Sequence, residues 1–73
     1  MTPDTTAVEV GQVWDQKPTA AMRAERVTRT VRIVHTDGPG GFVQVVPAEG
    51  RGRMSHIRYA LFLRRFTLRE AAR

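Results

Sequence analysis

Residues 27–35, V-T-R-T-V-R-I-V-H, set the expected fold of this 73-residue chain. Val27, Val31 and Ile33 share one parity, and Thr28, Thr30 and Arg32 share the other, which is the period-2 pattern of a half-buried strand. β-branched residues dominate the stretch and favour an extended backbone. We therefore predict a central strand here, with Val31 and Ile33 in the core.

The segment before this strand reads as a first strand followed by a loop. Residues 8–14, V-E-V-G-Q-V-W, alternate and then break at Gly11, which indicates a bulge or a sharp bend. Trp14 carries the largest apolar side chain, and we expect it to cap the core with its indole N–H on a partner at the rim. Residues 15–26 form the loop, within which Thr19 is a suitable N-cap for one or two helical turns.

The segment after the central strand contains two dense turn signals. Residues 37–41, D-G-P-G-G, predict a tight turn, and residues 42–47, F-V-Q-V-V-P, a third strand that ends or lies at an edge at Pro47. Residues 48–52, A-E-G-R-G, predict the next turn.

The last third of the chain fits two descriptions. In the first, a strand at 53–59, one tight turn at 60–63 and a strand at 64–69 follow one another. The residues then expected to point inward are Ile57, Tyr59, Phe66 and Leu68, and those expected to point outward are Arg58, Arg65, Thr67 and Arg69. In the second, a single helix covers most of the segment and Ile57, Leu61, Leu68 and Ala72 share one face. We favour the strands, because three strands alone would leave a sheet edge and an uncovered face.

The resulting order predicts an all-β fold: an SH3-like five-stranded small barrel with one short helical turn before the last strand. A single domain at 8–70 is expected, between tails at 1–7 and 71–73. A domain of this size buries only about 60% of the surface of its unfolded chain, and without cysteine it has no disulfide or thiolate metal site to stabilise it. No apolar run reaches the roughly 20 residues that cross a membrane, and the first ten residues do not resemble a secretory signal. We expect a cytoplasmic protein with no membrane partner.

Positive charge is concentrated toward the C-terminus. The formal net charge is +5, with −1 over residues 1–49 and +6 over residues 50–73. This asymmetry favours an anionic partner, most often nucleic acid. The alternative is GC-rich coding, since eleven of the twelve basic residues are arginine.

The chemistry-bearing residues do not form a catalytic or metal-binding pattern. Ser55 and His56 are neighbours on a predicted strand and point to opposite faces, so they cannot act as nucleophile and base. His35, His56 and Asp37 lack the spacing of a metal site. We expect no enzyme activity and no metal or cofactor.

Two binding surfaces remain as hypotheses. The first is a nucleic-acid-binding face built from the outward arginines, Arg32, Arg51, Arg53, Arg58, Arg65 and Arg69, with Arg58, Arg65 and Arg69 expected on neighbouring strands. The second is a protein-binding groove lined by Trp14, Tyr59 and Phe62, or an exposed strand edge that pairs with a partner.

Four sequence elements carry a resemblance to a known group. They are V-x-V-G-Q-V-W at 8–14, an R-x-V-R-I strand at 29–33, G-R-M-S-H-I at 52–57 and R-F-T-L at 65–68. With them the chain resembles a group of short, mostly uncharacterised proteins from actinobacteria and their phages. The resemblance implies a small barrel and an accessory role, in the host cytoplasm if phage-encoded, and it carries no activity or functional residue to this chain. The leading hypothesis is weak nucleic-acid binding, and the alternative is a module that docks on and redirects a host protein.

Overall fold

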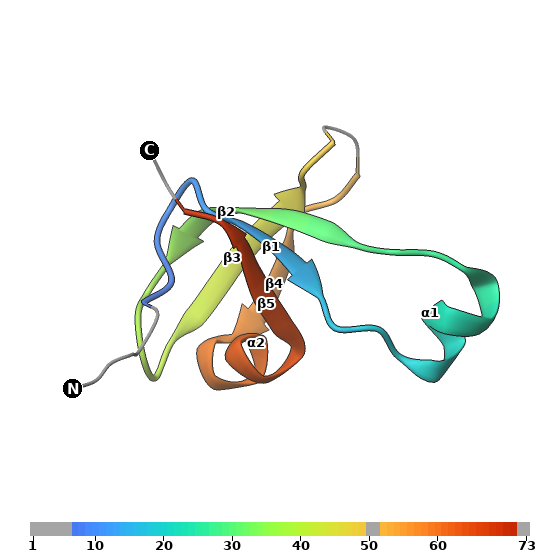
Figure 1. Ribbon diagram of the computed structural model, residues 1–73. Coiled ribbons are helices and arrows are strands. Elements are labelled where there is room, and N and C mark those ends of the chain that lie inside the picture. The colour runs from blue at the N-terminus through green and yellow to red at the C-terminus, as the bar shows by residue number, and fades with distance from the viewer. Residues whose placement is uncertain (1–6, 50–51, 72–73) are drawn as a thin grey trace.

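The computed structural model describes residues 7–49 and 52–71. In chain order its elements are β1 (Val13–Gln16), α1 (Ala20–Glu25), β2 (Thr30–Thr36), β3 (Phe42–Pro47), β4 (Ser55–Arg58), α2 (Tyr59–Arg65) and β5 (Phe66–Glu70) (Figure 1). The five strands form one antiparallel sheet in the order β4-β3-β2-β1-β5. Most of the expected tails at 1–7 and 71–73 lies outside the described residues, as does Arg51.

The expected central strand is β2, which lies in the middle of the sheet. Val31 and Ile33 are buried, at 0% and 1% exposure, as their parity predicts. The strand begins at Thr30 rather than at Val27, whose side chain is 47% exposed. A register shift between Ile33 and His35 marks a bulge in the pairing with β3, and it leaves Val34 exposed.

The β2–β3 hairpin has the expected glycine-rich turn. Gly38 and Gly40 have φ of +82° and +88°, in the left-handed region that glycine adopts without strain. The backbone N–H of Gly38 donates to the hydroxyl of Thr36, which fixes the start of the turn. Val43 and Val45 on β3 then face the core, both fully buried.

The first strand is shorter than its alternating sequence suggests. β1 begins at Val13, and residues 8–12 instead form a turn, with Gly11 at φ +96°. The turn stays attached to β2, because the N–H of Gly11 donates to the carbonyl of Ile33 and the N–H of Ile33 to that of Gln12. Val8 is buried by this turn, whereas Val10 is exposed.

The last third is strand, helix, strand. The turn expected at 60–63 is the two-turn helix α2, and β5 follows it directly, so the single-helix alternative is wrong. Tyr59 and Phe66 are buried, Ile57 and Leu68 pack against the core, and the four residues expected outward are all exposed. The inward or outward direction of each of these residues was therefore predicted correctly. The strands are shorter than the expected 53–59 and 64–69, because Tyr59 and Arg65 belong to α2.

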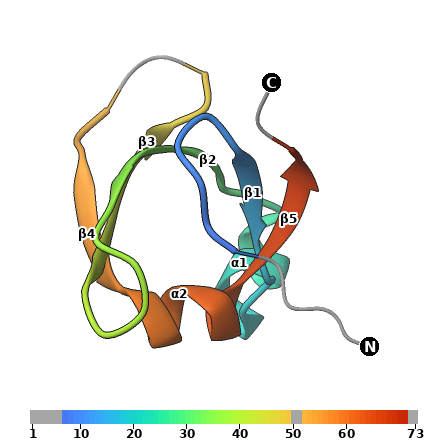
Figure 2. The same cartoon turned by 90° about the vertical axis from the view of Figure 1, so that its left-hand side faces the viewer.

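The sheet curls around a single core, and α2 lies across the opening between its two edge strands (Figure 2). No pairing joins β4 to β5 within 7–49 and 52–71, so the sheet is not closed. The core consists of residues from β1, β2, β3, β5, α2 and the N-terminal turn, and Ile57 of β4 packs against it. Its largest members are Trp14, Tyr59, Phe62 and Phe66. In the part of the chain that the structure describes, no helix is long and apolar enough to span a bilayer.

Candidate functional site

The structure describes five of the six outward arginines, all but Arg51, and separates them into two groups. Arg32 on β2 and Arg69 on β5 flank β1, and Arg65 ends α2 where β5 begins. Arg53 and Arg58 lie before and on β4, the opposite edge of the sheet. The prediction that Arg58 stands on a strand next to Arg65 and Arg69 is therefore wrong, because three strands lie between β4 and β5.

Arg58 is engaged within its own edge of the sheet. Its guanidinium carbon lies 5.4 Å from the ring centroid of Phe42, its cross-strand partner on β3. This cation–π contact covers part of an exposed ring. Arg58 thus has a local structural role at a distance from the other group.

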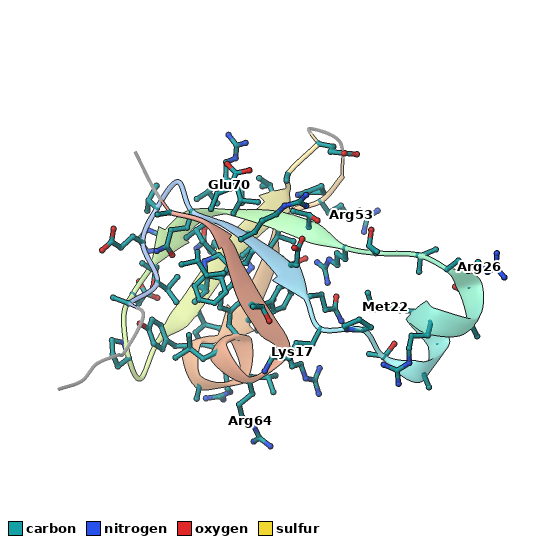
Figure 3. All side chains as sticks on the ribbon, in the orientation of Figure 1. Lys17, Met22, Arg26, Arg53, Arg64 and Glu70 are labelled. Atoms are coloured by element: carbon teal, nitrogen blue, oxygen red, sulfur yellow. The ribbon has the colours of Figure 1, made fainter. Side chains whose placement is uncertain are left out.

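Lys17, which was not among the predicted binding residues, lies beside the group formed by Arg32, Arg65 and Arg69. Gln16 pairs with Phe66, and the backbone N–H of Lys17 donates to the carbonyl of Arg65 at 2.7 Å. The β1–β5 ladder is thereby extended by one pair, so Lys17 and Arg65 face the same side of the sheet. Lys17 lies beside α2, and Arg64 extends from α2 away from the sheet (Figure 3); both line one hollow.

Two adjoining hollows mark this region of the surface. One has a volume of about 560 Å³ and the other about 360 Å³, and they share Gln16, Lys17 and Pro18. Their basic residues include a set that we call the basic junction: Lys17, Arg64, Arg65 and Arg69. All four are exposed, and every described residue that lines the two hollows is charged, polar or proline.

Asp15 is the one carboxylate among the described lining residues. Its Oδ1 accepts a hydrogen bond from the hydroxyl of Thr30 at 2.6 Å and lies 3.4 Å from Nη1 of Arg69. The half-exposed ion pair contributes little to stability, at most about 1 kcal/mol. The ion pair holds the Arg69 guanidinium over β1. The basic junction keeps a net positive charge, because Asp15 is one carboxylate against four cations.

Arg29 also lines the larger hollow, but its guanidinium is directed elsewhere. Its Nη2 donates to the hydroxyl of Ser55 at 3.3 Å, so it bridges from the start of β2 to the start of β4. The only serine of the chain is thus a hydrogen-bond acceptor, and its neighbour His56 is exposed.

The aromatic residues proposed to line a peptide groove are in the core. Trp14, Tyr59 and Phe62 are 3%, 8% and 0% exposed, so they offer no open groove and that hypothesis does not fit. The indole N–H of Trp14 donates to Oε1 of the buried Gln12 at 3.0 Å, as the expected rim contact requires. The hydroxyl of Tyr59 accepts a hydrogen bond from the N–H of Val8.

The histidines do not assemble a metal centre. Nε2 of His35 lies 2.8 Å from Oδ1 of Asp37, and this hydrogen bond holds the pKa of the Asp37 carboxyl below its ordinary value. No group of three His, Cys or acidic residues suited to a metal ion occurs within 7–49 and 52–71.

Lys17 and Arg64 are the junction residues missing from the sequence-based set. A signal for Lys17 was present, because Lys17 continues the parity of the charged residue Asp15 beyond the expected end of the strand. Comparison with known proteins found no matching family model, no similar curated protein and no similar solved structure. The functional argument therefore depends on the geometry of the chain itself.

Proposed function

We propose that this protein binds the sugar–phosphate backbone of double-stranded nucleic acid through the basic junction, without catalysing a reaction. The observation that carries the proposal is the convergence of Lys17, Arg64, Arg65 and Arg69 on hollows with a single carboxylate among their described lining residues. The four cations come from the start of the β1–β2 connection, from α2 and from β5. An extended set of cations of this kind suits a polyanion better than one small anion.

The lining of the hollows favours nucleic acid over a protein ligand. Phosphate oxygens accept hydrogen bonds from Arg, Lys, Thr and Gln side chains, and these residue types make up most of the lining. Protein interfaces instead have an apolar and aromatic centre. Such a centre is absent from the described lining residues, in which proline is the only apolar type.

The distribution of aromatic residues favours a duplex over a single strand. Proteins that bind single strands stack the bases on exposed aromatic rings. Four of the five aromatic residues of this chain are buried. The fifth, Phe42, lies near the opposite edge of the sheet under Arg58. Binding through charge alone contacts the sugar–phosphate backbone, which is the same for every base sequence, so little sequence preference is expected.

The proposal includes the fold class and the biological setting. The strand order β4-β3-β2-β1-β5 and the helix before β5 support an SH3-like small barrel whose last pairing is replaced by α2. A cytoplasmic accessory role, of the kind implied by the resemblance to short actinobacterial and phage proteins, would suit a weak, sequence-independent duplex binder.

The experiment is a fluorescence-anisotropy titration with duplex DNA, single-stranded DNA and RNA at low and moderate salt. The parent should bind the duplex most tightly, and its affinity should fall steeply with salt. Each neutralised phosphate contributes about −0.9 to the slope of log K against log salt for a duplex. The double variant Lys17→Ala/Arg65→Ala should therefore shallow that slope by about two units.

The matched control is Arg53→Ala/Arg58→Ala, which removes the same charge from the opposite edge of the sheet. Its slope should stay close to that of the parent. Equal effects of the two double variants would show that net charge, not the basic junction, governs binding. If none of the three nucleic acids binds at low salt, the proposal is wrong and docking on a host protein becomes the leading hypothesis.

A further inference from the structure

Residues 17–29 form an arm that leaves the sheet between β1 and β2 and projects away from the core (Figure 1). The arm carries α1, and none of the residues of α1 is buried. Met22 is half-buried, and the other five are exposed. Packing against the core therefore does not explain why this segment is helical.

The helix is instead held by bonds within the arm. The hydroxyl of Thr19 accepts from the N–H of Met22 at the first turn. At the other end the N–H of Arg26 donates to the carbonyl of Arg23, and the N–H of Val27 donates to that of Met22. Both ends of the helix are thus capped, which gives the arm a defined shape without tertiary support.

Arg26 occupies the residue position in this cap where glycine is usually found. Its backbone has φ +57° and ψ +40°, in the left-handed region, and it is the one non-glycine residue with positive φ in the described part of the chain. Glycine adopts this conformation more easily because it lacks a Cβ atom. An arginine here is locally unfavourable, so a role for its side chain would account for it.

The position of the side chain indicates what that role is. Arg26 lies at the tip of the arm, with its guanidinium directed away from the sheet (Figure 3). No hydrogen bond or ion pair joins that guanidinium to the described residues. The arm carries Lys17, Arg23, Arg26 and Arg29 against Glu25, a net charge of +3.

We propose that the arm makes a second contact with the duplex, in which Arg26 binds a backbone phosphate beyond those that the basic junction binds. This inference rests on the proposed function, because Lys17 belongs both to the arm and to the junction. The longest dimension of the molecule is 37 Å. At 3.4 Å per base pair a duplex of about 11 base pairs covers this whole length, so a duplex of about 16 base pairs is long enough to contact the junction and the arm tip together.

The decisive variant is Arg26→Gly, since glycine suits the left-handed cap and removes the charge. Its melting temperature should equal or exceed that of the parent, while its affinity for a duplex of about 16 base pairs at low salt should fall about 3–10-fold. The salt slope should become shallower by about one unit. Arg26→Lys, which keeps the charge, should retain most of the affinity.

A matched single variant separates the position of the lost charge from its amount. The single variant Arg53→Ala is the control for lost charge, and it should bind the duplex of about 16 base pairs as the parent does.

The outcomes separate this inference from the function on which it rests. If Arg26→Gly binds the duplex of about 16 base pairs as tightly as the parent while Lys17→Ala/Arg65→Ala does not, the second contact is refuted and binding through the basic junction is supported. An equally large loss of affinity for Arg53→Ala also refutes it. If the parent binds no duplex, both proposals fail.

Discussion

Phe62 is the residue on which the attachment of α2 depends, so its removal is the most informative test of the fold. Its side chain is fully buried, its ring is stacked on Phe66 with centroids 4.5 Å apart, and it meets the edge of Trp14 at 4.9 Å. Phe→Ala substitutions at such positions cost about 3–5 kcal/mol, because apolar contact is lost and a cavity remains. A domain of this size has a total free energy of unfolding of about 4–11 kcal/mol. We expect Phe62→Ala to remove at least about a quarter of this free energy, and all of it if the total lies near the lower value.

The assay uses a reporter that the chain already contains. Trp14 is the only tryptophan, is 3% exposed and touches the Phe62 ring, so its fluorescence follows unfolding in urea. A loss of 3–5 kcal/mol corresponds to a fall in melting temperature of about 12–40 °C. Phe62→Leu, which keeps an apolar side chain, should fall between the parent and Phe62→Ala.

Phe42→Ala is the matched control, because that ring is 41% exposed and contacts Arg58 at the sheet surface. It should cost about 1 kcal/mol or less. If Phe62→Ala melts within about 5 °C of the parent, α2 does not cover the core as described, and the assignment of the fold is wrong.

Two further predictions concern polar groups. Oε1 of Gln12 accepts hydrogen bonds from the N–H of Glu9 at 2.8 Å and from the indole N–H of Trp14 at 3.0 Å. Gln12→Ala leaves both donors unpaired, so it should lower the free energy of unfolding in urea by about 1–3 kcal/mol. A loss below about 0.5 kcal/mol would contradict this. Because the hydrogen bond with His35 depresses the pKa of Asp37 below 3.8, its contribution to stability is present above that pH and is lost as the pH falls through the lower folded value. An NMR titration should place the Asp37 midpoint below 3.8, and His35→Ala should move it upward; a parent midpoint at or above 3.8 would refute the assignment.

The sequence predicted the faces of the strands well, because parity depends only on the local backbone. Val31, Ile33 and Phe66 were assigned correctly for that reason. Parity fails where the ladder is interrupted. Val27 lies in the arm, where its N–H completes the helix cap, and His35, which shares the parity of Ile33, is exposed beside a bulge that shifts the register. The alternation is broken near both places, because Arg29 and His35 are polar residues at the inward parity.

The binding surfaces were harder to predict, since they depend on which strands are neighbours. Parity places Arg58 and Arg69 on outward faces but cannot say that they stand at opposite edges of the sheet. The supposed aromatic groove was wrong for an energetic reason. A small domain without disulfides needs its largest apolar side chains in the core, and Trp14 and Phe62 are therefore buried.

The pairing of β1 with β5 also determines when the fold can be completed during synthesis. β1 joins β2 through the arm, but its second neighbour is distant: Arg69, which contacts Asp15, lies 54 positions further along the chain. A ribosome adds about 5–20 residues per second, so the edge of β1 stays open for roughly 3–11 s after Asp15 is made. During that interval the open edge of β1 can pair with another copy of the chain. Lys17 and Arg32 are made before β5, and the like charges that they place beside β1 oppose such pairing.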